Sequence, residues 1–140
     1  MVLTAVAAPL RLYKLESQLW LDEIAALTGG YRRPILEILT TFPGYFPHPL
    51  YELLGRVSLV LNGESALSIR LPAALFGIAG VLMFYKLARR LFSPGEAFVA
   101  TLMIAVSYHH IYYSQYARGY TSYLFFFLAA RIPQPAWRSP

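Results

Sequence analysis

Two long stretches without a charged residue constrain this chain more than any other feature of its sequence. The first runs from Leu71 to Tyr85, about 15 residues, and the second runs from Ala97 to Ala117, about 21 residues. A helix rises about 1.5 Å per residue, so the second run can cross a hydrocarbon core of about 30 Å. The first can do so if its flanking cations extend their side chains toward the headgroups. We therefore predict membrane spans over residues 68–90 and 96–116.

The composition also favours a membrane as the solvent. Hydrophobic residues make up 57% of the 140 residues and charged residues 14%, against about 45–50% and 25% in soluble domains. These values exclude a disordered chain, and the absence of cysteine excludes a disulfide scaffold or a thiol site. The net charge of +5 comes from scattered basic residues. Anionic lipid headgroups or phosphates are therefore the expected partners, and nucleic acid is not.

Two other apolar segments are too short to cross a bilayer alone. Residues 1–12 reach about half of the hydrocarbon thickness and lack the features of a signal peptide, so we interpret them as the end of a first span. Residues 119–131 stop at a proline-containing sequence and are interpreted as a truncated span. We predict one all-α unit of polytopic transmembrane helices over residues 1–140, without a separate soluble domain.

Residues 20–62 have the spacing of short amphipathic helices. A first helical pattern follows Asp22, a candidate N-cap, and stops at Gly29–Gly30. A second pattern ends at Pro43–Gly44, and Pro49 opens a third. Their moderate hydrophobicity and charged faces predict helices that lie on the membrane surface in the first external loop.

Basic residues set the expected orientation of the chain. Lys86, Arg89 and Arg90 crowd the connection between the two predicted complete spans. Positively charged connections tend to stay on the cytoplasmic side. Residues 20–62 are therefore expected on the outer side of the membrane.

An acidic pair is the first candidate for chemistry. Asp22, the only aspartate, precedes Glu23 and follows Trp20, an aromatic residue that suits the headgroup level. A carboxylate there could act as a general base or bind a divalent cation. A helix N-cap with a first-turn acid explains the same pair without catalysis. The adjacent His109 and His110 make a poor metal pair, because neighbouring residues on a helix point about 100° apart.

Several polar residues are candidates for substrate binding. His48 lies between two prolines, which give its imidazole a fixed direction, although a polar helix-start residue would look the same. Arg70 and Arg118 stand at span ends on the predicted outer side, where a guanidinium can bind a phosphate or simply extend toward the headgroups. Gln115 is expected on the same side of a continued helix as Arg118. Tyr113 belongs to a row of tyrosines that an interfacial belt also explains.

Four segments occur in a familiar order: Leu19–Glu23 (LWLDE), Pro47–Tyr51 (PHPLY), Ile69–Gly77 (IRLPAALFG) and Ile111–Tyr120 (IYYSQYARGY). In this order they resemble the N-terminal part of the polytopic GT-C glycosyltransferases, in particular the protein mannosyltransferase and aminoarabinose transferase-like group. The resemblance covers nearly the whole chain. One departure is Leu50, which stands where the family often has a second proline after the histidine.

The resemblance implies an integral membrane enzyme that acts on the outer or luminal side, and we expect it in the bacterial plasma membrane with its active side outward. Such an enzyme takes a sugar from a polyprenyl-phosphate carrier and passes it to an acceptor protein or glycolipid. Asp22 would be the catalytic carboxylate, with Glu23 beside it, and a divalent metal at Asp22 is the one cofactor to consider. The candidate residues for binding the substrate are His48, Arg70, Arg118, Gln115 and Tyr113.

Members of this family have many more spans and a C-terminal region. We therefore expect the chain to be a fragment that does not transfer sugar alone. An alternative is a small noncatalytic membrane protein that packs its spans against a larger partner, which needs neither Asp22 nor His48. A transporter fragment is a third interpretation, but it would favour charged or broken positions inside the spans, and no acid lies in the first complete one.

Overall fold

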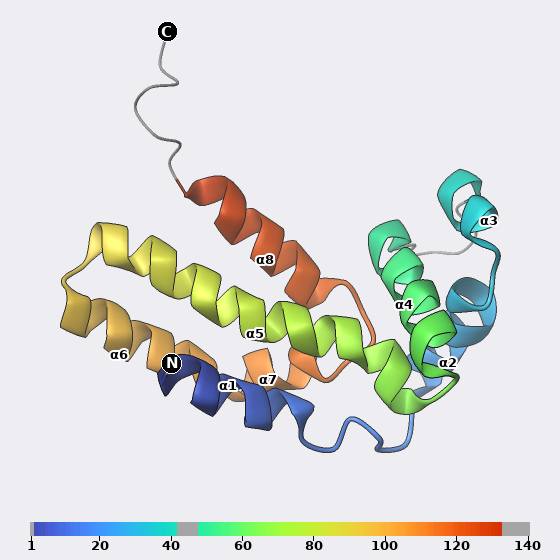
Figure 1. Ribbon diagram of the computed structural model, residues 1–140, viewed down its shortest axis with the longest axis horizontal. Helices are drawn as coiled ribbons and strands as arrows, with labels where there is room; N and C mark the ends of the chain where they lie inside the picture. The colour runs from blue at the N-terminus through green and yellow to red at the C-terminus, as the bar shows by residue number, and fades with distance from the viewer. Residues whose placement is uncertain (1, 42–47, 133–140) are drawn as a thin grey trace, which may run out of the picture.

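The computed structural model describes residues 2–41 and 48–132, and its elements in these ranges are all helical (Figure 1). The all-α prediction is therefore confirmed for the part of the chain described. The helices are α1 (Val2–Leu12), α2 (Leu21–Ala26), the π-helix η1 (Leu27–Tyr31), α3 (Ile35–Thr40), α4 (Pro49–Asn62), α5 (Ala66–Leu91), α6 (Pro94–Ala105), α7 (Tyr108–Ser114) and α8 (Tyr120–Arg131).

Helix α5 is the centre of the molecule, and α1, α4, α6, α7 and α8 pack against it (Figure 1). Ser65 caps its start, because the Ser65 hydroxyl accepts the Ser68 N–H at 3.1 Å. With 26 residues, α5 contains the predicted span 68–90 and is the one helix in the described ranges that is long and apolar enough to cross a membrane. A polytopic arrangement thus remains a prediction.

The predicted span over residues 96–116 is not one helix. The chain leaves the helical conformation between α6 and α7, at Val106 and Ser107. A side chain from far away in the sequence binds the end of α6: the Arg11 guanidinium donates to the Ala105 carbonyl at 3.0 Å and the Ile104 carbonyl at 3.5 Å. These are carbonyls that a helix end leaves without intrahelical partners, so a buried cation stabilises the break.

Arg11, in the last turn of α1, is fully buried. Its guanidinium also donates to the Ala7 carbonyl at 3.0 Å and lies 2.8 Å from His110 Nδ1. Gly77 of α5 makes room for this cluster, since a Cβ there would stand 2.2 Å from Ser114 Oγ. The approach of α1, α6 and α7 to α5 therefore depends on a glycine and on one buried cation.

The chain does not continue as a helix from α7 to Arg118, contrary to the predicted shared helical face. Residues 115–119 connect α7 to α8 without helical structure. The Gln115 side-chain amide donates to carbonyls at the end of α1. The Ala117 N–H donates to the Glu23 carboxylate at 2.8 Å. Polar groups of residues 115–119 thus find hydrogen-bond partners in other elements, so they do not depend on a continuation of α7 for them.

The short helices predicted within residues 20–62 are present, with two corrections. The N-cap of α2 is Trp20 and not Asp22, because the Glu23 carboxylate accepts the Trp20 N–H at 3.0 Å in a capping box. Gly29–Gly30 does not stop the helix, which continues as the π turn η1.

The limits of α4 follow the sequence prediction. Pro49 occupies its first turn, and the helix ends at Asn62 before Gly63, whose φ of 79° is accessible to glycine. The turn predicted at Pro43–Gly44 lies outside the described residues.

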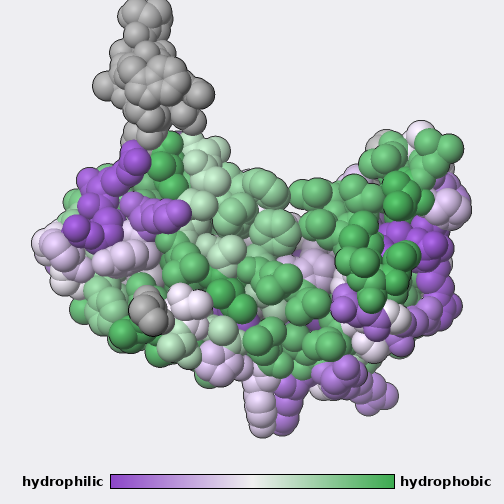
Figure 2. Space-filling model, in the orientation of Figure 1, coloured by the Kyte–Doolittle hydropathy of each residue, from purple (hydrophilic) through white to green (hydrophobic). Residues whose placement is uncertain are grey.

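Large apolar side chains cover much of the surface. Figure 2 shows hydrophobic residues over the middle of the visible face and hydrophilic residues toward its two ends. Tyr123, Phe126 and Phe127 of α8 are all exposed, as is Leu75 of α5. Exposed apolar surface of this extent is typical of a protein that faces lipid or a partner.

Candidate active site

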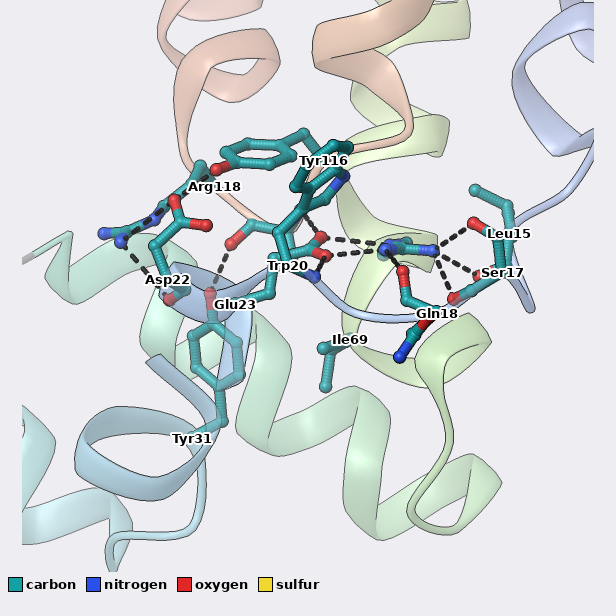
Figure 3. Close-up of polar contacts among 12 residues, drawn as sticks. Leu15, Ser17, Gln18, Trp20, Asp22, Glu23, Tyr31, Ile69, Tyr116 and Arg118 are labelled. Atoms are coloured by element: carbon teal, nitrogen blue, oxygen red, sulfur yellow. Dashed lines mark hydrogen bonds and ion pairs between the residues drawn. The ribbon is translucent and has the colours of Figure 1, made fainter. Parts of the chain in front are cut away.

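Asp22, Tyr116 and Arg118 meet where α2 faces the 115–119 segment (Figure 3). The Tyr116 hydroxyl donates to Asp22 Oδ2. Arg118 Nη2 lies 3.5 Å from the same oxygen and donates to the Asp22 backbone carbonyl at 3.3 Å. The Asp22 side chain is nevertheless 44% exposed, so a substrate can reach this carboxylate.

Glu23, the neighbour of Asp22, is completely buried in the protein. Its carboxylate accepts Arg70 Nε at 2.9 Å and Arg70 Nη2 at 2.6 Å, a bidentate pair. The same oxygens also accept the backbone N–H groups of Trp20 and Ala117. Four donors therefore hold this carboxylate, which favours a positioning role for Glu23 over a role in chemistry.

Arg70, expected to bind the carrier phosphate, lies inside the protein with 2% exposure. Besides the Glu23 carboxylate, its guanidinium donates to the carbonyls of Leu15, Ser17 and Gln18 and to the Ser17 hydroxyl, at 2.9–3.1 Å. A guanidinium has five N–H donors, and each of those of Arg70 has an acceptor here. The geometry thus favours Arg118, and not Arg70, as the cation for a phosphate.

Two buried tyrosines donate to backbone carbonyls near the site, and the sequence analysis assigned a role to neither of them. The Tyr31 hydroxyl donates to the Ala117 carbonyl at 2.6 Å, and the Tyr51 hydroxyl donates to the Ile69 carbonyl at 2.8 Å. Burial raises the pKa of both phenols, so they stay protonated donors. Tyr51 ends the Pro47–Tyr51 segment, but no sequence signal distinguishes Tyr31 among the 11 tyrosines of the chain.

His48 lies at the start of α4 beside an open groove of about 270 Å³ between α4 and α8. Leu50 and Phe126 give this groove apolar walls, and His48 and Ser122 give it polar groups. Burial, and next the positive charge of Arg118, lower the pKa of His48, while Glu52 opposes them. His48 is therefore neutral at pH 7 and close enough to Arg118 to feel its charge.

The structure separates the two remaining candidates from Asp22. Gln115 donates to the Leu10 and Tyr13 carbonyls at 2.8 Å each, so it fixes the end of α1. Tyr113 packs on Tyr120 with ring centroids 4.8 Å apart, and the Tyr120 ring lies 6.1 Å from that of His48. Tyr113 therefore adjoins the His48 side of the site, whereas Gln115 serves the packing of α1.

The residues around Asp22 do not form a metal centre. Among residues 2–41 and 48–132, no group of three His, Asp or Glu side chains could hold a metal ion. Glu23, the nearest acid in sequence, already accepts four hydrogen bonds. Among the described residues, Asp22 would thus be a lone carboxylate ligand for a metal ion.

These features define a helical protein with a large apolar surface, a candidate span and an accessible carboxylate beside a cation. Residues 46–132 match the family of dolichyl-phosphate-mannose-protein mannosyltransferases, and the chain belongs to that family. The resemblance drawn from the four segments is thereby confirmed. At the level of the family, the activity is glycosyl transfer of the GT-C type from a lipid-linked sugar, and the proteins are membrane-associated.

The matched range begins after Asp22 and Glu23, so the roles of these two residues rest on their own segment and on the structure. Comparison with curated proteins and with solved structures gives no match.

Proposed function

We propose that this chain provides the catalytic base and part of the phosphate site of a glycosyltransferase that uses a polyprenyl-phosphate sugar. The observation that carries this proposal is the accessible Asp22 carboxylate, held by Tyr116 and Arg118 at one end of the molecule. The adjacent Glu23 is buried and saturated, so the exposed acid is the one able to meet a substrate.

The reaction needs two groups that this site supplies. Asp22 accepts the proton of an acceptor hydroxyl, and the hydroxyl oxygen forms a bond to the anomeric carbon of the sugar. The bond between that carbon and the phosphate oxygen breaks, and the polyprenyl phosphate leaves with the bonding electron pair. Arg118 stabilises the charge that develops on the departing phosphate.

His48 belongs to the same phosphate site in this proposal. Burial, and next the charge of Arg118, lower the pKa of His48 in the unliganded protein. A bound phosphate supplies negative charge that offsets this effect and favours the imidazolium, which then donates to the phosphate. The Tyr120 ring lies 6.1 Å from that of His48, and the Tyr113 ring packs on Tyr120.

We further propose that this site faces outward from a bacterial plasma membrane and that α5 spans it. The support is the position of Lys86, Arg89 and Arg90 at the end of α5, opposite to Arg70 near its start. Basic residues favour the cytoplasmic side, which leaves Asp22 on the other side.

Donor binding tests the phosphate site without requiring turnover. Trp20, 58% exposed and two residues from Asp22, reports binding by fluorescence once Trp137 is replaced by Phe. We expect the affinity of Arg118→Gln for a short-chain polyprenyl-phosphate mannose to be lower by about 10-fold or more, because a charge-assisted hydrogen bond is lost. Arg32→Gln, at the exposed pair with Glu64, is the control and should bind as the parent does. Equal affinities in both variants would exclude Arg118 from the site.

Transfer of labelled mannose from the same donor to an acceptor tests the base. We expect Asp22→Asn to keep donor binding and to lower transfer by about 100-fold or more, the usual contribution of a general base. If the chain alone is inactive, as predicted above, the substitution is made in a longer version of the gene. Retained transfer would remove the catalytic assignment and favour the noncatalytic packing protein.

A further inference from the structure

Ala117 is held by side chains at both of its backbone polar groups. Its N–H donates to Glu23 Oε1 at 2.8 Å, and its carbonyl accepts the Tyr31 hydroxyl at 2.6 Å. The residue is fully buried, although it lies in the non-helical 115–119 segment. A loop residue with both polar groups bound to buried side chains has little freedom to move.

The two side chains that hold Ala117 are themselves fixed. Glu23 is tied to α5 through the bidentate pair with Arg70. The Tyr31 ring packs closely on α4, since a Cβ added at Gly55 would stand 3.0 Å from it, and the Tyr51 ring lies at 5.9 Å. The Ala117 contacts thus connect the segment to α2, η1 and, through Arg70, α5.

The residues on either side of Ala117 are those that contact Asp22. Tyr116 donates to the Asp22 carboxylate, and Arg118 lies 3.5 Å from it (Figure 3). Holding the backbone between them sets the position from which both side chains extend. Groups that support a reacting carboxylate need such fixed placement, because small displacements are costly for catalysis.

We infer that Tyr31 is a positioning residue: together with Glu23 it clamps Ala117 and thereby holds Tyr116 and Arg118 against Asp22. The significance of this clamp for catalysis rests on the proposed function, but its geometry can be tested without substrate.

The chain offers a matched pair of variants for the test. Tyr31→Phe and Tyr51→Phe each remove a buried hydroxyl that donates to a backbone carbonyl, and their rings are neighbours. Only the first releases Ala117. The probe is 3-fluorotyrosine placed at position 116 and observed by ¹⁹F NMR in detergent micelles. Asp22→Ala shows where the resonance lies once Tyr116 has lost its acceptor.

We expect Tyr31→Phe to move the Tyr116 resonance toward its position in Asp22→Ala, and Tyr51→Phe to leave it in place. An unmoved resonance in Tyr31→Phe, or equal shifts in both variants, would overturn the clamp. A resonance that stays in place while Arg118→Gln still weakens donor binding would overturn the clamp and leave the proposed function standing. A Tyr116 resonance that moves in Tyr31→Phe, together with unchanged donor binding in Arg118→Gln, would overturn the proposed function and support the clamp.

Hydrogen–deuterium exchange of the unaltered chain keeps the inference testable even if Tyr31→Phe does not fold. We expect the Ala117 amide to exchange slowly, because its acceptor is a buried carboxylate. Exchange of this amide at the rate of an exposed loop would overturn the inference.

Discussion

Two adjacent carboxylates occupy opposite environments in this protein. Glu23 is buried and accepts four hydrogen bonds, whereas Asp22 is 44% exposed and keeps contact with Tyr116 and Arg118. The same division applies to the two arginines, since Arg70 has all its donors engaged inside the protein and Arg118 is only partly buried. Each acid is thus paired with a cation of its own environment, Glu23 with the buried Arg70 and Asp22 with the partly exposed Arg118.

The buried pair predicts a large loss of stability at one residue. Glu23→Gln leaves the Arg70 guanidinium buried without a counter-charge, which typically costs about 3–5 kcal/mol. We expect a clear fall in the thermal unfolding midpoint, followed by circular dichroism in detergent. Glu64→Gln removes the acid of an exposed pair with Arg32 and should leave the midpoint almost unchanged. Similar midpoints for the two variants would contradict a structural role for the Glu23–Arg70 pair.

The titration of His48 provides a second prediction at the residue scale. Burial and Arg118 hold its pKa below the ordinary value of 6.5. The unfolded chain therefore binds more protons at and below about pH 6.5, and this group destabilises the fold as the pH falls through that range. By NMR of labelled histidine, we expect Arg118→Gln to raise the His48 midpoint and Glu52→Gln to lower it further. Opposite shifts would mean that these two charges do not act on His48.

At the scale of the elements, α5 and α7 approach closely because α5 has a glycine at the contact. A Cβ at position 77 would stand 2.2 Å from Ser114 Oγ and 2.6 Å from Ser114 Cβ. At position 80, one turn further along α5, the nearest atom to an added Cβ would be His110 Nε2 at 3.8 Å, an ordinary contact. An added Cβ therefore fits at position 80 but clashes with Ser114 at position 77.

Alanine at these two positions should affect the unfolding free energy differently. We expect Gly77→Ala to lower the unfolding free energy by about 1–3 kcal/mol through overpacking. Gly80→Ala should leave it unchanged or raise it by up to about 1 kcal/mol through helix propensity. Unfolding in detergent, followed by circular dichroism, measures both, and Gly77→Ala with Ser114→Gly should recover stability. Equal destabilisation of the two single variants would contradict this packing.

Sequence reasoning predicted the elements whose signals are local. Pro49 and Gly63 delimit α4, and an uncharged run identified α5. The break between α6 and α7 has no such signal, since Val106 and Ser107 are ordinary residues and the group that supports the break is Arg11, far away along the chain.

In the candidate site, too, local motifs were recognised from the sequence and long-range contacts were not. The Asp22 segment and Arg118 were recognised as motifs, but the motifs did not show that Glu23 and Arg70 would engage each other inside the protein. Their pairing joins α2 to α5 across 47 positions. Tyr31 could not be selected because its role is to bind a backbone carbonyl, which leaves no mark on sequence spacing.

For the whole molecule, the absence of cysteine makes orientation directly measurable. Thr28 lies near the Asp22 end and is exposed, and Leu91, 68% exposed, ends α5 at its basic end. We expect an impermeant maleimide to label Thr28→Cys in intact cells and to label Leu91→Cys only after permeabilisation. Labelling of Thr28→Cys only after permeabilisation would place Asp22 on the cytosolic side and exclude the carrier-sugar function.

If α5 crosses the membrane as we propose, its length fixes the distance between the candidate site and the opposite headgroups. Arg70 near its start anchors Glu23, and Arg89 near its end begins the last basic cluster. Nineteen steps at about 1.5 Å each separate them by about 28 Å, close to the thickness of a hydrocarbon core. Under the proposed function, the length of α5 sets the height at which the sugar-bearing phosphate meets Asp22, so a turn added to α5 would move Asp22 away from its lipid-borne donor.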